Sequence, residues 1–476
     1  MKTKKYLSNK VKMLTIAFIS LGVFTHAQAT QDNIVELDRN QVEEIVKRSY
    51  QYVAMYNVNN KTAETDESSA MGTGGWNKLS LNTNLFDATI KNIVRPNNDT
   101  LYQIAMLDLR DQPMILDIPA IDSSYVSLQT SAYDHYVNVP LSSVKGDYTQ
   151  AETVLFYTER TKGYHAGEQI PGIDRYLEMS GDFVIAFHRI MPHANEPEKF
   201  KEITEKIDSL KLLSLSEYQT GKVITASPIM FPKVGASDTD VFRDNLLEVM
   251  QFIFNHTTFD INNEMDQELL AAYKPLGIVP GKEWNPLTHN KIDHDLFHEV
   301  ALDVQKDVYR MLNDPTTPSQ LTFLFKPKGE IGLLTQTIQS VLGPIGLPVA
   351  EAMYPPVQTV DGEPMNALND YVVSMKKDDM PPANAFWSIT LYDSHNGFFI
   401  PNAHNKYSVG ENAGYKLNSD GGIDIYIAAE KPAGVPTENW LPINRNDEGI
   451  DLILRIYATN FEKLQNWKAP SVMLLK

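Results

Sequence analysis

Arg95-Pro96-Asn97-Asn98-Asp99-Thr100-Leu101-Tyr102 stands directly before a segment, 102–109, in which apolar and polar residues alternate. The alternation predicts a β-strand, so these eight residues, the polar octet, form the loop that leads into it. Pro96 fixes its own φ angle and is expected to hold Arg95 in extended geometry. Such loops often carry functional side chains. Alternatively, Arg95 and Asp99 pair with each other and the two asparagines form an Asx turn.

The segments that follow the octet predict strands first, helices next and strands again. Short β-rich segments punctuated by Gly, Pro, Asp and Ser are typical of an antiparallel sandwich, and they lie at 113–119, 125–130, 153–157 and 183–187. A helix is expected from Pro197, and apolar residues recur at helical spacing over 242–253 and 297–308. Alternating segments return at 386–392, 423–427 and 452–457, which predicts a second sandwich or a jelly roll.

The segments before the octet predict an exported protein with a leading helix. Residues 1–29 have a basic start, a short apolar core and the cleavage pattern Ala27-Gln28-Ala29, which together indicate a Sec-type signal peptide. The mature protein is therefore expected in the periplasm or outside the cell. Asp38 and Gln41 resemble a capping box, which predicts a helix of about four turns. The polar segment 57–75 is expected to be a loop.

Composition excludes several classes of function. The chain has 476 residues and no cysteine, so disulfides, thiolate nucleophiles and cysteine-bound metals are excluded. Its net charge is −18, and removal of the five lysines in residues 1–29 lowers it to −23. Such an acidic chain disfavours nucleic acid as a partner. No segment after the signal peptide approaches the roughly 20 apolar residues of a membrane span.

Several motifs, taken in their order along the chain, resemble a known pairing of domains. They include the polar octet, Tyr125 to Gln129, Leu276 to Lys282, Pro381-Pro382, Ala385 to Ser388, Tyr407-Ser408 and Asn439 to Pro442. The chain resembles the bacterial exported proteins that pair domain of unknown function 1254 with domain of unknown function 1214. The resemblance implies an immunoglobulin-like β-sandwich, a helical domain and a C-terminal jelly-roll-like β-sandwich. We expect the first, with its leading helix, at 30–214, the second at 215–347 and the third at 348–476. The resemblance implies no reaction.

Asp99 is the first candidate for acid or base chemistry. Arg95 would hold it ionised or orient an anionic substrate, and Tyr102 is the third candidate of this catalytic group. No Gly-x-Ser-x-Gly motif is present, so a serine hydrolase of that type is not indicated.

Further polar and aromatic residues are candidates for ligand binding. They are Asn98, Tyr136, Asn402, Tyr407, Trp440 and Arg455. Asn402 and Tyr407 lie in an expected loop of the last domain, where they can fix polar groups of a ligand. Trp440 is either core or ligand surface. Arg455 lies mid-strand and needs a partner if it points inward.

The leading hypothesis is a cleft between the two β domains that binds a small molecule, with turnover left open. We expect its lining from Arg95, Asp99, Tyr102, Asn402, Tyr407 and Trp440. The alternative is a non-catalytic envelope protein that serves interaction or structure. A second alternative is a metal site at His289, His294 and His298, whose spacing also suits an exposed helix face. No cofactor and no metal ligand are assigned, and association into a homo-oligomer stays open.

Overall fold

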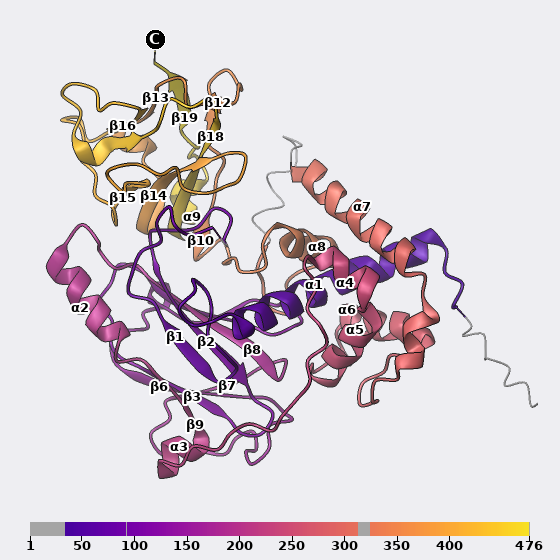
Figure 1. Cartoon of the computed structure of the whole chain (residues 1–476). Helices are drawn as coiled ribbons and strands as arrows, with labels where there is room; N and C mark the ends of the chain where they lie inside the picture. Colours follow the sequence, from indigo (N-terminus) through magenta and orange to yellow (C-terminus); the bar gives the residue numbers. More distant parts are fainter. Residues whose placement is uncertain (1–33, 92, 313–323, 476) are drawn as a thin grey trace, which may run out of the picture.

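The computed structural model describes residues 34–91, 93–312 and 324–475, so the predicted signal peptide, 1–29, lies outside the described residues. The protein is mainly β with a helical middle. Figure 1 shows the C-terminal β domain, orange to yellow, above one end of the N-terminal β domain, with most helices packed to one side. No helix in the described ranges is long and apolar enough to cross a bilayer.

The N-terminal β domain consists of two antiparallel-rich sheets packed face to face. Its strands are β1 (Lys78–Leu81), β2 (Leu101–Asp108), β3 (Met114–Ile118), β4 (Val126–Ser131), β5 (Asn138–Ser142), β6 (Glu152–Tyr157), β7 (Arg175–Glu178), β8 (Phe183–Ile190) and β9 (Lys211–Ser214). One sheet has the order β1-β2-β8-β4-β5 and the other β7-β6-β3-β9. Leu107, Leu116 and Phe156 from the two sheets share one core, which confirms the predicted sandwich. Helix α2 (Pro197–Ile207) adds Ile203 and Ile207 to that core.

The helical part packs around the leading helix, α1 (Arg39–Glu64). The other helices of this part are α4 (Asp238–Asp244), α5 (Leu246–Asn255), α6 (Glu264–Tyr273), α7 (His294–Leu312) and α8 (Leu333–Leu342). Helix α3 (Leu215–Thr220) lies apart from them and packs against the β7-β6-β3-β9 sheet of the N-terminal β domain (Figure 1). Sequence periodicity predicted one helix over 242–253, but the chain breaks at Asn245 between α4 and α5. Its side-chain amide donates to the carbonyl of Lys233 at 2.9 Å. This tertiary contact competes with the helical path, and periodicity cannot reveal it.

Helix α1 is longer than predicted, because residues expected in a loop find buried partners. The prediction of a loop from residue 57 is wrong as far as Glu64, where the helix ends. The Asn57 side-chain amide donates to an Asp238 carboxylate oxygen at 2.7 Å, and its oxygen accepts from the Gly235 amide at 2.9 Å. Asn60 donates to the Tyr133 hydroxyl at 3.0 Å. Polar composition suggested a loop, but here it marks a buried, hydrogen-bonded helix face. The predicted capping box of Asp38 and Gln41 is confirmed.

The C-terminal β domain again consists of two packed sheets. Its elements are β10 (Ala352–Met353), β11 (Gln358–Thr359), β12 (Met365–Asn366), β13 (Tyr371–Met375), β14 (Ala383–Asp393), β15 (Ser408–Gly410), β16 (Ile423–Ala428), β17 (Trp440–Pro442), β18 (Gly449–Thr459), α9 (Phe461–Leu464) and β19 (Ser471–Leu474). One sheet has the order β10-β18-β14-β15, with β12 also on β18, and the other has the order β11-β19-β13-β16-β17. Trp387 lies in the core between them.

The two β domains meet through an apolar contact and a neighbouring polar one. Phe386 on β14 stacks on Tyr457 on β18 with ring centroids 4.1 Å apart. Tyr125, beside β4, packs against the same Tyr457 ring at 5.2 Å. The loop before β2, which contains the polar octet, lies next to this contact and reaches strands β14 and β18. The junction therefore places residues from distant parts of the chain side by side.

Candidate functional site

The polar octet is a turn whose backbone is held by the C-terminal domain. Asn97 accepts a hydrogen bond from the amide of Asp99 at 2.6 Å, which is the Asx turn considered for this loop. Arg95 pairs with Asp451 and not with Asp99. The expectation of extended geometry at Arg95 is wrong, since its φ is +51°. Its amide donates to the carbonyl of Gly397 at 2.7 Å, so contacts across the junction hold this left-handed residue in place.

Asp99 is fully enclosed at the junction. Its relative exposure is 0%, and the Ser388 hydroxyl on β14 donates to its Oδ2 at 2.5 Å. Its Oδ1 has no hydrogen-bond partner among the described residues. Burial raises the pKa of Asp99, against the opposing effects of Arg455 and Ser388. The carboxyl group is therefore held in a dry, crowded position, with one oxygen unsatisfied.

Arg455 provides the positive charge of the junction. It lies mid-strand in β18, is buried, and donates to Thr390 Oγ1 at 2.9 Å and to the Tyr392 hydroxyl at 2.7 Å. It also donates to the carbonyl of Arg95 at 3.3 Å. Arg455 therefore has the buried partners that its position predicted, namely three hydrogen-bond acceptors. We call Asp99, Ser388, Thr390, Tyr392 and Arg455 the junction cluster.

Tyr102, the third catalytic candidate, lies beside the junction cluster with its ring in apolar contacts. The ring packs edge-on against Phe187 at 4.9 Å and Phe86 at 5.4 Å between centroids. Burial raises the pKa of its hydroxyl, and the guanidinium of Arg189 acts in the opposite direction. Arg189 is itself occupied, since it donates to Gln129 at 2.7 Å. The contacts of the Tyr102 ring are therefore packing contacts at the C-terminal end of the octet.

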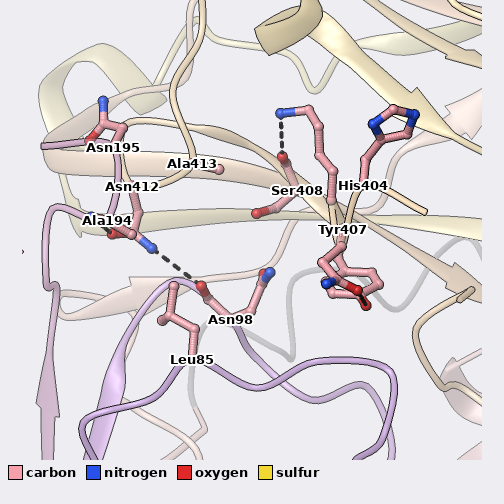
Figure 2. Close-up of a pocket in the computed structure, with 11 residues that line it drawn as sticks. Leu85, Asn98, Ala194, Asn195, His404, Tyr407, Ser408, Asn412 and Ala413 are labelled. Carbon is pink, nitrogen blue, oxygen red and sulfur yellow. Dashed lines mark hydrogen bonds between the residues drawn. The ribbon is translucent and has the colours of Figure 1, made fainter. Parts of the chain in front are cut away.

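A pocket opens next to the octet, between the two β domains. We call it the junction pocket; its volume is about 300 Å³, at the lower end of the range for small-molecule sites. Its lining residues are Leu85, Asn98, Ala194, Asn195, His404, Asn405, Lys406, Tyr407, Ser408, Asn412 and Ala413. The N-terminal domain contributes the loops before β2 and after β8, and the C-terminal domain contributes the segments on both sides of β15. Figure 2 shows Asn98 and Ser408 facing the same space from the two domains.

Polar atoms in the junction pocket lack partners. The side-chain oxygen of Asn98 and the hydroxyl of Ser408 are buried and have no hydrogen-bond partner among the described residues. Lys406 donates to the carbonyl of Ser408 at 3.3 Å. Burial lowers the pKa of Lys406 to about 8, although Glu438 acts to raise it. Buried polar groups in native proteins are usually paired, so these two oxygens are exceptions to that rule.

Two predicted binding residues, Asn402 and Trp440, are not among the lining residues but contact them. Asn402 donates to the carbonyl of Lys406 at 2.9 Å and accepts from the amides of His404 and Lys406, so it fixes the loop that carries the lining residues. Trp440 packs edge-on against His404 at 5.0 Å and donates to the carbonyl of Ala428 at 2.8 Å. Of the residues predicted for ligand binding, Asn98 and Tyr407 line the pocket, and Arg455 lies in the neighbouring junction cluster.

Tyr136 is not brought to the junction pocket. It lies on the helical side of the molecule, where Lys328 sits 5.2 Å from the centre of its ring. Lys328 pairs with Asp266 at 2.8 Å and lies 3.8 Å from Asp134. Burial raises the pKa of Asp134, while Lys328 acts to lower it. Tyr136 therefore belongs to a separate buried polar cluster that anchors the helices to the N-terminal sandwich.

The three histidines of the metal hypothesis make contacts that do not favour a shared ion. His294 and His289 stack with ring centroids 4.2 Å apart, and a ring nitrogen of His294 lies 2.8 Å from the carbonyl oxygen of His289. His298 Nδ1 lies 2.9 Å from the carbonyl oxygen of Thr239. In the part of the chain that the structure describes, no group of three or more His, Asp or Glu side chains is arranged to hold a metal.

Sequence reasoning missed several residues of the junction pocket. Lys406 and Ser408 flank the predicted Tyr407, but an isolated lysine or serine carries no signal of its own. Asn412 joins the domains, since its amide donates to the Asn98 carbonyl at 3.2 Å and its oxygen accepts from the Ala194 amide at 2.9 Å. Burial raises the pKa of the neighbouring Glu411 to about 7, although the Trp387 amide acts to lower it. These roles depend on tertiary contacts that no local pattern encodes.

The fold and the junction define a protein of two β domains with a helical middle, and family models match each β domain. The model of the family described as protein of unknown function (DUF1254) matches residues 76–213, and the model of the family described as protein of unknown function (DUF1214) matches residues 351–461. The chain therefore belongs to the proteins in which a DUF1254 domain is followed by a DUF1214 domain. This confirms the resemblance inferred from the motifs.

One solved structure shows the same fold. The VPA0106 protein from Vibrio parahaemolyticus matches with a TM-score of 0.67 and 22% sequence identity, over 91% of this chain and 100% of that chain. At this identity the likeness establishes the fold alone. An uncharacterized protein from Burkholderia cenocepacia aligns over 92% of this chain and 94% of that chain, with a TM-score of 0.39 and 13% identity. No protein among the curated sequences matches the chain.

Proposed function

We propose that this protein is an exported binding protein that takes a small polar molecule into the junction pocket. The observation that carries the proposal is the pair of buried, unpartnered oxygens of Asn98 and Ser408, two residues that line one cavity from two domains. A buried polar atom without a partner costs about 1–3 kcal/mol, and a ligand that pairs with it recovers that free energy on binding. Export is supported by the sequence of residues 1–29.

The junction cluster has a positioning role in this proposal. Ser388 donates to Asp99, the charge of Arg455 acts on the same carboxyl group, and Asp99 is the direct neighbour of Asn98 in the octet. Tyr392 donates to the carbonyl of Pro96 at 2.6 Å and so fixes the other end of the loop. Asn98 is thereby presented to the pocket on a backbone that both domains hold, which reduces the ordering cost of binding.

A thermal-shift screen of the purified protein tests the proposal. The panel should contain sugars, small organic acids and their uncharged amides, and divalent metals with a chelator control. A ligand at about 100 times its dissociation constant stabilises the native state by about 2.7 kcal/mol, which moves the midpoint by several degrees. A shift that is lost when Asn98 is replaced with alanine supports binding in the pocket. A folded protein that responds to none of the panel contradicts the proposal and favours the interaction-protein alternative.

Replacing Ser408 with alanine should separate binding from stability. Because the Ser408 hydroxyl has no partner in the described part of the chain, we expect the free energy of unfolding to stay within about 0.5 kcal/mol of the parent value. Ligand affinity should fall about tenfold, since the hydroxyl's contact is made only in the complex. Chemical denaturation and calorimetric titration give the two values.

The matched control for this prediction is Ser131→Ala. Ser131 is also a buried serine, but its hydroxyl donates to the carbonyl of Tyr136 at 3.0 Å, away from the pocket. Its replacement should lower the free energy of unfolding by about 1–2 kcal/mol and leave ligand affinity unchanged. If Ser408→Ala destabilises the protein as much as the control does, the hydroxyl already has a partner in the free protein. That result would contradict ligand binding through Ser408.

A further inference from the structure

We propose that the molecule held in the junction pocket carries a carboxylate, and that the ammonium group of Lys406 is its counterion. The inference rests on the proposed function and names the class of ligand for that same pocket. It is carried by the position of Lys406, a cation that lines a cavity built by two domains.

Lys406 has no anionic partner within ion-pair distance among the described residues. Its ammonium group donates to one neutral acceptor, the carbonyl of Ser408 at 3.3 Å. Glu438 is the nearby acidic residue whose field acts on it, but Glu438 already pairs with Lys416 at 2.9 Å. An ammonium group that is buried without a counterion is costly, and buried charges in proteins are normally paired.

The other lining residues of the junction pocket provide no negative charge to pair with the Lys406 ammonium group. None of the pocket's lining residues is acidic, and the four from the N-terminal domain, Leu85, Asn98, Ala194 and Asn195, are all uncharged. The other titratable groups on this face include His404 and Tyr407 in the lining and Asp87, whose charge acts on Tyr407. Glu411 lies beside Asn412, and the pair His193 and Glu196, at 3.1 Å, lies next to Ala194. A small anion is therefore the complement that the pocket lacks.

The neutral groups around Lys406 suit a carboxylate that also bears a hydroxyl group. The Ser408 hydroxyl can donate to a carboxylate oxygen, and the unpartnered oxygen of Asn98 requires a donor from the ligand. An aliphatic acid without a hydroxyl supplies no such donor. Hydroxycarboxylates satisfy Lys406, Ser408 and Asn98 together.

A neighbouring hollow gives room for the remainder of such a molecule. It has a volume of about 560 Å³, shares Leu85 and Ala194 with the junction pocket, and extends to Pro197 and Phe200 of α2. Asp87 also lines it, so this end of the ligand should carry no negative charge. The carboxylate should thus lie at Lys406 while the body of the molecule extends toward α2.

Titration with lactate, gluconate and benzoate, each compared with its own uncharged amide, tests the inference. We expect a hydroxycarboxylate to bind and its amide to bind at least about thirtyfold more weakly, as expected when one partner of a buried charge pair is missing. Lys406→Met should reduce carboxylate affinity by a similar factor, and Lys406→Arg should retain most of it. The matched control is Lys431→Met, because Lys431 is an exposed lysine whose ammonium also donates to a carbonyl, that of Val435 at 2.8 Å.

The pH dependence of affinity is a second readout. Because burial lowers the pKa of Lys406 to about 8, its charge is lost as the pH rises from about 7.5 to about 9.5, while a carboxylate stays ionised throughout. Affinity should therefore fall severalfold or more over this interval, and Lys406→Met should abolish the fall. If neutral sugars or amides bind as well as the acids do, the carboxylate inference is overturned and the binding function stands. If neither acids nor neutral molecules bind, both fail.

Discussion

Replacing Arg455 with methionine is expected to lower the free energy of unfolding by about 3–5 kcal/mol, because three buried hydrogen bonds of the guanidinium are lost and their acceptors stay enclosed. Methionine fills much of the same space but cannot donate to Thr390, Tyr392 or the carbonyl of Arg95. The carboxyl group of Asp99 would then be enclosed without the positive charge that opposes its protonation. Urea denaturation at neutral pH measures the loss.

Two further variants show whether the loss comes from the buried charge. Arg445→Met is the matched control, because Arg445 pairs with Asp370 at 2.6 Å near the surface, where such a pair contributes about 1 kcal/mol or less. Adding Asp99→Asn to Arg455→Met should restore part of the stability, since the enclosed side chain then carries no charge. Equal losses for Arg455→Met and Arg445→Met would show that the junction cluster does not depend on its buried charge.

Replacing Glu411 with glutamine should make the protein less sensitive to alkaline pH. Burial, with a smaller contribution from Asp99, raises the pKa of Glu411 from 4.5 to about 7 in the folded state. A raised pKa stabilises the folded state below about pH 4.5, and this contribution is lost as the pH rises through about 7. The shift corresponds to about 3 kcal/mol, which the glutamine variant should not lose. Its side-chain oxygen can still accept from the Trp387 amide, as Glu411 does at 2.8 Å.

Denaturation of the parent and the variant at about pH 5 and about pH 8.5 measures this difference. The two proteins should be similar in stability at the lower pH, and Glu411→Gln should be the more stable by up to about 3 kcal/mol at the higher pH. Glu430→Gln, at an exposed glutamate of the same domain, serves as the control and should follow the parent. Parallel pH profiles for parent and Glu411→Gln would refute the prediction.

The sequence predicted those parts of the fold that local patterns determine. Alternation of apolar and polar residues placed β2, β14 and β18 close to their observed bounds, although most residues of these strands are buried on both faces. It failed where distant partners decide the conformation: Asn57 continues a helix because Gly235 and Asp238 satisfy its amide, and Arg95 takes a positive φ because Gly397 binds its backbone. Composition and periodicity contain no information on such partners.

The candidate site was predictable only where its residues are unusual in sequence. The polar octet was recognised because eight residues combine charges, amides and a phenol, and the structure places it at the junction. The need of Arg455 for partners followed from its apolar neighbours in a strand. Lys406 and Asn412 were missed, because a single lysine or asparagine in a loop is ordinary until the fold shows what it faces.

The long separation between Asp99 and its partner Ser388 has a consequence for biosynthesis. The two residues lie 289 positions apart, so a ribosome that adds about 5–20 residues per second makes Ser388 about 15–60 s after Asp99. The strands of the N-terminal domain are completed during that interval, but Ser388 is not yet present to donate to the carboxylate of Asp99. We expect the new chain to keep the octet hydrated until β14 and β18 have been made, and to expel that water last.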